Sequence, residues 1–230
     1  MLSVLRGLGV AALSCWLSLV AGQGGPPQVL PPEAVAQLEK SLEAASRHAQ
    51  HVWRDTPPVN DDGTVNAYVE IPRGDRRKYE FDMGANRREI DREIPEDVGG
   101  YPVNYGFVPQ TVSYDGDPFD ALVLGPALRG GDVVRGVVVG LMRMNDEKGA
   151  DSKVVLARAG PGGEPLDTLM ENDRLRIGDY FRRYKRHESG KYSEVPGWAD
   201  AAEGLEYVKT AHAFFLQCRN LAEQSCTIRK

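Results

Sequence analysis

A short acidic segment, Asp115-Gly116-Asp117-Pro118-Phe119-Asp120, runs directly into the apolar run Ala121-Leu122-Val123-Leu124. The apolar run has the length and composition of a buried strand. Pro118 lacks a backbone N–H donor, which favours a turn or the entrance of a strand at this point. Any fold of this chain must therefore hold three carboxylates at the mouth of a strand that lies in its core.

Carboxylates crowded in this way repel one another unless protons or cations compensate their charge. If the segment is extended, Asp115 and Asp117 project from the same side of the chain. Hard divalent cations such as Mg²⁺ bind carboxylate oxygens, waters and phosphates. An acidic turn that only caps a strand fits this segment equally well, whereas an EF-hand loop does not, because Phe119 and Asp120 stand where that loop needs Asp or Asn and then Gly.

The N-terminal segment has the pattern of a secretory signal peptide. Residues 1–7 carry a single charge, at Arg6, and residues 8–21 are uncharged and mostly apolar. This apolar stretch is shorter than the roughly 18 residues of a membrane span. We therefore expect residues 1–22 to be a signal peptide and the protein to be exported to the periplasm or secreted, without stable membrane insertion. A mitochondrial transit peptide and an uncleaved membrane anchor are the alternatives.

Removal of that segment would leave two cysteines, Cys218 and Cys226. Such a pair can form a disulfide in an oxidising compartment, and two free thiols are the alternative. The length of 230 residues suits one domain with terminal extensions. The formal net charge of -5 argues against a nucleic acid as the main partner.

The rest of the chain divides into an extension, residues 23–65, and a folded domain, residues 66–230. The extension begins as a linker, and Pro32 and Glu33 then predict a helix that continues through Arg54.

Within the domain, short strands come first and helices follow. Asp200 is the predicted N-cap of the last helix, and the Gly/Pro-rich stretches 99–109 and 190–197 are predicted to interrupt regular structure. This order predicts an α+β fold: a small, closed antiparallel β-barrel, OB-like, with helices packed outside. The predicted strands lie at 67–71, 78–81, 90–94, 119–124, 133–144 and 154–157, and helical spacing recurs from 175 to 185 and again after 200.

Acidic residues, cationic residues and tyrosines gather at the predicted strand ends and in the Gly/Pro-rich loops, where functional side chains are commonly held by a rigid scaffold. The presence of many acidic and many basic residues fits a site that binds a polyanion together with metal ions. Carboxylates would hold the cations, and Lys, Arg and Tyr donors would hold phosphoryl oxygens. The sequence contains no P-loop, no dinucleotide-binding Gly-x-Gly-x-x-Gly after a strand, no Gly-x-Ser-x-Gly elbow and no zinc-protease pair of histidines.

The acidic segment and its neighbours resemble the bacterial type of family I soluble inorganic pyrophosphatases. Residues 115–121 fit that family's signature, D-x-D-P-hydrophobic-D-hydrophobic. The resemblance covers roughly Asn66 to the last helix and leaves the N-terminal extension outside. The other matching motifs are Val69-Glu70-Ile71-Pro72, Lys78-Tyr79-Glu80, Asp91-Arg92, Tyr101-Pro102-x-Asn104-Tyr105-Gly106, Asp146-Glu147-x-Gly149-x-Asp151-x-Lys153 and Tyr184-Lys185.

The resemblance implies Mg²⁺-dependent hydrolysis of pyrophosphate to two phosphates, with several Mg²⁺ ions in each site and Mn²⁺ as a substitute. It implies that Asp115, Asp120, Asp146, Asp151 and Glu80 hold the metal ions. It further implies that Asp117 is the general base and that Lys78, Arg92, Tyr105, Lys153, Tyr184 and Lys185 bind the phosphates, with Lys78, Arg92 and Tyr105 also acting in catalysis. Glu70, Tyr101 and Glu147 are assigned to supporting positions.

Members of that family are commonly homo-oligomers, so the resemblance also implies assembly. Two other functions compete with hydrolysis of pyrophosphate. One is a non-catalytic extracytoplasmic protein that binds phosphate or divalent cations, and the other is a phosphatase for larger polyphosphates or nucleotides. Phosphate release from pyrophosphate in the presence of Mg²⁺ separates these alternatives.

Overall fold

The computed structural model describes residue 26 and residues 29–219. The predicted signal peptide, residues 1–22, and Cys226 lie outside the described residues. Within the described part of the chain, no helix is both long enough and apolar enough to cross a membrane.

Five strands are hydrogen-bonded in a ring, because the pairings lead from β1 through β4, β5, β8 and β6 back to β1. Four of these pairings are antiparallel, but β5 and β8 run parallel. The prediction of a mixed α+β fold is confirmed, whereas the prediction of an all-antiparallel sheet is wrong at the β5–β8 pair. The ring strands are β1 (Val65–Ile71), β4 (Asn104–Phe107), β5 (Asp120–Val123), β6 (Val133–Asp146) and β8 (Lys153–Arg158).

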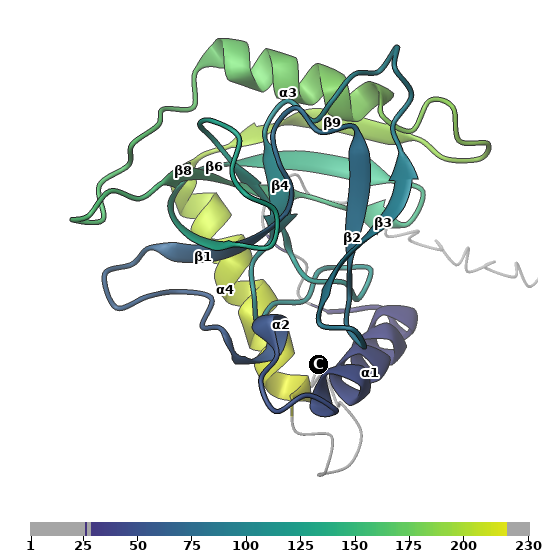
Figure 1. The fold of residues 1–230 in the computed structure, drawn as a ribbon, viewed down its shortest axis with the longest axis vertical. Helices are drawn as coiled ribbons and strands as arrows, with labels where there is room; N and C mark the ends of the chain where they lie inside the picture. Colours follow the sequence, from purple (N-terminus) through teal and green to yellow (C-terminus); the bar gives the residue numbers. More distant parts are fainter. Residues whose placement is uncertain (1–25, 27–28, 220–230) are drawn as a thin grey trace, which may run out of the picture.

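Four more strands extend this framework. Strand β6 is long enough to pair with β1 at its start, with β8 in its middle and with β7 (Gly149–Ala150) and β9 (Ser193–Ala199) at its end. Strands β2 (Arg77–Asp82) and β3 (Arg87–Glu93) form a separate hairpin, which stands beside the ring in Figure 1. The ring and the hairpin are the two scaffolds from which the site described below is built.

Besides the two-residue strand β7, the sequence analysis did not predict two of these strands, β4 and β9. Strand β4 lies inside the Gly/Pro-rich stretch 99–109, and β9 overlaps the stretch 190–197. Both carry a glycine, and glycine weakens a strand pattern when only the sequence is read. In the structure both strands are held by antiparallel pairing to a long neighbour, β4 to β1 and β9 to β6.

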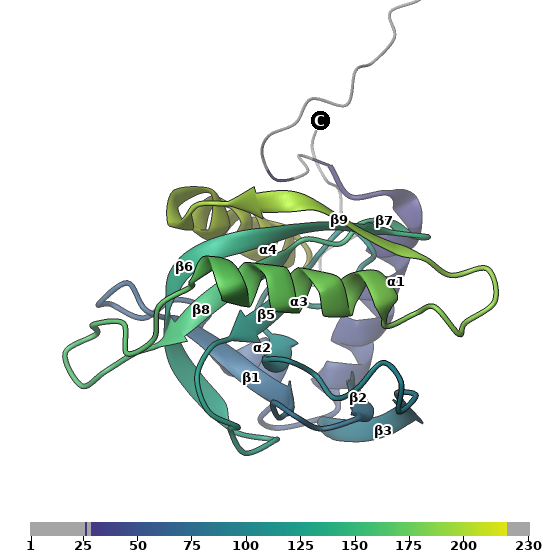
Figure 2. The same cartoon turned by 90° about the horizontal axis from the view of Figure 1, so that it is seen from above.

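Helices cover the strands from outside (Figures 1 and 2). Helix α3 (Glu171–Arg183) packs on β9. Helix α4 (Ala201–Cys218) packs on β6, and Asp200 accepts a hydrogen bond from the backbone N–H of Glu203, as its prediction as N-cap requires. Cys218, at the end of α4, is disulfide-bonded, and its partner lies outside the described residues.

The N-terminal extension forms two helices rather than one. Helix α1 (Pro32–Ser46) starts at the predicted proline, and the short helix α2 (Val52–Asp55) follows after a break. The Arg54 guanidinium donates to the carbonyl oxygens of Ala45 (2.7 Å) and His48 (3.1 Å), so it takes over acceptors that a continuing helix would have used. These bonds cap the C-terminal end of α1.

Helix α1 is anchored by an apolar face. Its buried residues join a cluster that includes Trp53 from α2 and Phe214 and Phe215 from α4. The Trp53 indole N–H donates to the Thr111 carbonyl oxygen, just before the acidic segment (3.1 Å). The extension is therefore part of the folded body, and its first helix lies below the β2–β3 hairpin in Figure 1.

Candidate active site

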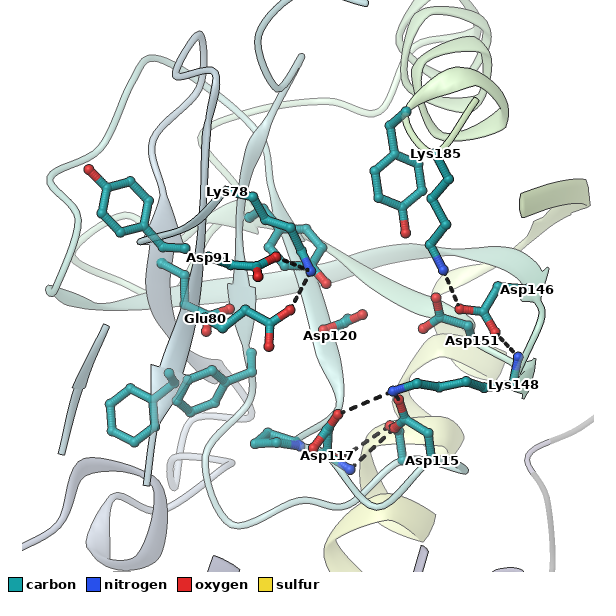
Figure 3. Close-up of a pocket in the computed structure, with 18 of the residues that line it drawn as sticks. Lys78, Glu80, Asp91, Asp115, Asp117, Asp120, Asp146, Lys148, Asp151 and Lys185 are labelled. Atoms are coloured by element: carbon teal, nitrogen blue, oxygen red, sulfur yellow. Dashed lines mark hydrogen bonds and ion pairs between the residues drawn. The ribbon is translucent and has the colours of Figure 1, made fainter. Parts of the chain in front are cut away.

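A cavity of about 390 Å³ opens between the acidic segment, the β2–β3 hairpin and the end of α3 (Figure 3). Strand ends and loops from widely separated parts of the chain meet there. The structure brings every predicted site residue except Lys153 to its wall. The predicted residues that line it are Glu70, Lys78, Glu80, Arg92, Tyr101, Tyr105, Asp115, Asp117, Asp120, Asp146, Glu147, Asp151, Tyr184 and Lys185.

Lys153 lies behind this wall instead of on it. Its side chain is only 1% exposed, and its ammonium group donates to Asp120 (2.5 Å) and to Asp151 (2.9 Å). Burial alone would lower the pKa of Lys153, but the two neighbouring carboxylates outweigh burial and raise that pKa above its ordinary value. Lys153 is therefore a buried counter-charge for two carboxylates, and its role in binding phosphate stays a prediction.

The acidic segment is a compact loop whose own groups determine its shape. The Ser113 hydroxyl and the Asp117 backbone N–H both donate to Asp115 Oδ1, at 2.9 and 3.2 Å. The Ser113 backbone N–H donates to the Asp117 carbonyl oxygen (2.7 Å). Gly116 has a φ of +90°, which glycine adopts without strain. The carboxylate of Asp115 is thus held by its own loop.

Asp117 is held more loosely, and its environment disfavours its charge. Burial in the cavity wall is the main cause that raises the pKa of Asp117 to about 7, and Asp115 adds to the increase while Lys148 opposes it. The Lys148 ammonium lies 3.2 Å from Asp115 Oδ2 and 3.9 Å from Asp117 Oδ2. The Asp117 side chain lines the cavity, and 48% of it is exposed.

The same excess of negative charge affects other carboxyl groups of the cavity. Burial is again the main cause that raises the pKa of Asp151 to about 7, with Lys153 lowering it and Asp120 raising it. Burial, followed by Asp120 and Glu80, raises the pKa of Glu70 well above its ordinary value. A divalent cation among these groups would relieve that repulsion, because it adds positive charge where the present charges do not balance.

A second group of carboxylates stands at the end of β6. The Lys185 ammonium donates to Asp146 Oδ2 (2.7 Å) and to both oxygens of Glu147 (3.1 and 3.0 Å). Lys185 follows α3, so this ion pair connects the C-terminal end of a helix with a strand of the ring. In Figure 3 Lys185 and Asp146 face the hairpin residues across the cavity.

The hairpin supplies cations to the opposite wall. Lys78 pairs with Glu80, two residues along β2, and its ammonium group is 3.4 Å from Asp91 on β3. Arg92 pairs with Asp91 (2.5 Å) and with Glu188 (2.6 Å), which lies in the loop after α3. This second contact ties the hairpin to the far side of the site.

Three tyrosines close the remaining side. The rings of Tyr101 and Tyr105 lie 5.5 Å apart, and Phe181 lies 6.2 Å from Tyr105 and 5.4 Å from Tyr184. Burial is the main cause that raises the pKa of all three phenols well above its ordinary value. Each phenol is therefore protonated at neutral pH and serves as a donor to an anion.

The donors fit a hard divalent cation, because they are carboxylate oxygens in a cavity that also holds phosphate-binding groups. Among the residues that the structure describes, no group of three carboxylates is already arranged to hold a metal ion. The ammonium groups of Lys148, Lys153 and Lys185 pair with these carboxylates instead.

Several cavity residues were not among the predicted site residues. Asp91 and Lys148 lie within the quoted motifs or between them, so their position offered a signal. Gln37 and Ser41 come from α1, far from any motif, and nothing in the sequence connects them with the site. The additional polar lining residues are Gln37, Ser41, Asp91, Ser113, Lys148 and Lys191.

Comparisons with known proteins give a consistent result. A family model described as inorganic pyrophosphatase matches residues 67–215. An inorganic pyrophosphatase of Gluconobacter oxydans is 38% identical over 156 residues, which are 65% of this chain and 90% of that protein. One from Thermus thermophilus is 39% identical over 167 residues, which are 68% of this chain and 94% of that protein.

Solved structures agree with these sequences. The crystal structure of the inorganic pyrophosphatase from Thermus thermophilus superposes with a TM-score of 0.65 at 35% identity and covers 72% of this chain and 99% of that one. The enzyme of Helicobacter pylori gives a TM-score of 0.64 at 29% identity, over 71% of this chain and 99% of that one. The matched region of the family model begins at residue 67, after both helices of the N-terminal extension.

Proposed function

This chain belongs to the inorganic pyrophosphatase family and is an inorganic diphosphatase, and we propose that it hydrolyses pyrophosphate to two orthophosphates with the help of bound Mg²⁺. One observation carries the proposal beyond the family relation. A single cavity is lined both by carboxylates and by Lys78, Arg92, Tyr105, Tyr184 and Lys185. Such a site fits a small, highly charged anion that arrives with divalent cations.

The carboxylates of the acidic segment and of β8 would hold the cations nearest the reaction, with Asp115, Asp120 and Asp151 as ligands. Asp146 and Glu80, on opposite sides of the cavity, would hold further ions that enter with pyrophosphate. Bound Mg²⁺ supplies a water of lowered pKa and stabilises charge on the attacking and leaving oxygens. Mn²⁺, which accepts the same oxygen donors, would be a substitute.

Asp117 would take the proton from the attacking water, as a general base. Its carboxylate faces the cavity between Asp115 and the hairpin (Figure 3), so a water there lies within reach of it. Positive charge near Asp115 would favour the ionised form of Asp117, since Asp115 is the neighbour whose charge most raises its pKa. Only the ionised carboxylate can accept the proton.

The cationic and phenolic side chains would bind the phosphates and offset the negative charge of the leaving group. Lys78, Arg92 and Tyr105 come from the hairpin and β4, and Tyr184 and Lys185 come from the end of α3. Lys153 would act from behind the cavity wall, by orienting Asp120 and Asp151. Glu70, Tyr101 and Glu147 support these groups: Tyr101 packs on Tyr105, and Glu147 holds Lys185.

Phosphate release tests the function. We expect the purified protein to release two phosphates from each pyrophosphate when Mg²⁺ is added, and to stop when a chelator removes the ion. In the same titration Asp120→Asn should require at least ~10-fold more Mg²⁺ for half-maximal rate, because a direct ligand loses its charge. Asp61→Asn, an exposed carboxylate away from the cavity, is the matched control. A chain that binds phosphate and Mg²⁺ without releasing phosphate would contradict the proposal.

Localisation and assembly remain proposals. We propose that residues 1–22 are cleaved and that the protein is exported and forms homo-oligomers. The disulfide-bonded state of Cys218 supports an oxidising compartment. Sequencing the N-terminus of protein recovered outside the cytoplasm should give a start near residue 23, and a start at Met1 would contradict cleavage.

A further inference from the structure

Helix α1 lies outside the region that matches the family, yet it forms part of the cavity wall. The family match begins at residue 67, whereas α1 ends at Ser46. Gln37 and Ser41, one turn apart on this helix, both line the cavity. An element outside the shared core therefore contributes polar groups to the site.

The contact between α1 and the acidic segment is close. A Cβ atom built on Gly116 would lie 2.6 Å from the Ala34 carbonyl oxygen and 2.8 Å from Gln37 Cβ. Only a residue without a side chain can occupy this position, because a Cβ at that distance would overlap the helix backbone. The loop that carries Asp115 and Asp117 thus rests directly on the backbone of α1.

The segment after α1 contacts the β2–β3 hairpin, which forms the opposite wall of the cavity. The His48 and His51 rings contact the carbonyl oxygens of Gly84 (2.7 Å) and Met83 (3.0 Å), at the tip of the β2–β3 hairpin. The Asn86 side chain accepts from the backbone N–H of Val52 (3.0 Å). The extension is consequently bonded to the hairpin and packed against the acidic segment at the same time, and it sets the position of one relative to the other.

Gln37 makes the most direct of these contacts with the site. Its amide Nε2 lies 3.5 Å from Asp117 Oδ1 and donates to it. Lys148, at 3.9 Å, approaches the other oxygen of the same carboxylate. Hydrogen bonds of catalytic groups are often long before substrate binds and shorten in the complex. Each oxygen of the Asp117 carboxylate therefore has one long contact, Oδ1 with the Gln37 amide and Oδ2 with the Lys148 ammonium group.

We propose that Gln37 is a positioning residue for Asp117, so that helix α1 is part of the catalytic apparatus of this chain. The proposal rests on the proposed function, since it assumes that Asp117 receives the proton from the attacking water. The amide fixes the carboxylate oxygen toward that water without carrying charge of its own. A donor at this position holds the ionised carboxylate, whereas an acceptor would repel it.

Two substitutions separate positioning from packing. Gln37→Ala removes the donor, and Gln37→Glu keeps the shape of the side chain but replaces the donor by a negatively charged acceptor. Lys40→Ala, on an exposed position of the same helix that does not line the cavity, is the matched control. All three new residues are good helix formers, so α1 should remain intact. Initial rates over a range of pyrophosphate concentrations at saturating Mg²⁺ give kcat and KM separately, and thermal unfolding monitors the fold.

We expect Gln37→Ala to lower kcat about 3- to 10-fold with KM nearly unchanged, as fits the loss of one long hydrogen bond of ordinary strength. Gln37→Glu should lower kcat further, by roughly 10- to 100-fold, because like charges then face each other. Lys40→Ala should match the wild type, and all variants should unfold at nearly the same temperature.

The opposite results overturn the proposal in recognisable ways. If Gln37→Glu is as active as the wild type, the side chain only fills space. If KM rises while kcat is unchanged, Gln37 contacts substrate and does not position Asp117. If the wild type itself releases no phosphate, the proposed function fails; if it is active and both Gln37 variants equal Lys40→Ala, only the role of Gln37 fails.

Discussion

Asp117→Asn is expected to lower kcat by about 10²- to 10⁴-fold, the usual contribution of a positioned general base. Asparagine has the shape of aspartate and keeps the backbone bond from Ser113 to the carbonyl oxygen of residue 117, but its amide cannot accept the proton of the attacking water. KM for pyrophosphate should change little, because the phosphate-binding groups stand on other elements. Steady-state rates at saturating Mg²⁺ measure both constants.

Asp61→Asn serves again as the control, since it removes the same charge from an exposed site outside the cavity. Thermal unfolding of Asp117→Asn should stay close to that of the wild type, because the carboxylate is half-exposed and its contacts with Gln37 and Lys148 are long, at 3.5 and 3.9 Å. Turnover within about threefold of the wild type would contradict the role of Asp117, because a base contributes far more than that.

Gly106→Ala is expected to destabilise the fold by roughly 3 kcal/mol or more, beyond the common range for overpacking. Gly106 lies on β4 opposite Val69 of β1. A Cβ at this position would lie 1.8 Å from the Tyr68 carbonyl oxygen and 2.8 Å from its carbonyl carbon. Backbone atoms cannot rotate away, so β1 and β4 would have to separate and the ring of strands would open.

Urea unfolding followed by circular dichroism measures this loss directly. Gly197→Ala on β9 is the matched control, because a Cβ there would meet no atom within 4 Å. Activity should fall together with stability, since Tyr105, the residue before Gly106, lines the cavity. An unfolding midpoint for Gly106→Ala equal to that of Gly197→Ala would show that the two strands are not packed as described.

Sequence patterns predicted the parts of the structure that local chemistry determines. The acidic segment does enter a buried strand, β5, and Asp200 does cap the last helix. The site residues could be named in advance because their motifs resemble those of a known family, and the structure brings all of them except Lys153 to the wall of one cavity. Their roles in catalysis remain proposals.

The parts that were missed depend on contacts between distant segments. Strand β4 is hidden in the sequence because Gly106, which weakens the strand pattern, is required by the close approach of β1. Lys153 begins a strand that is buried almost throughout, so alternation along the strand could not show that this ammonium group points inward. Gln37 is 80 residues from Asp117 along the chain, and only the packing of α1 on the loop connects them.

The buried position of Lys153 has a consequence for how the molecule behaves between turnovers. Its ammonium group cannot diffuse out of the protein, so two of the clustered acids keep a permanent counterion even when every exchangeable ion has left. Removal of the metal ions by a chelator should consequently stop hydrolysis without separating the strands through repulsion between these carboxylates. The metal-free enzyme should therefore stay folded and bind metal ions again when they return.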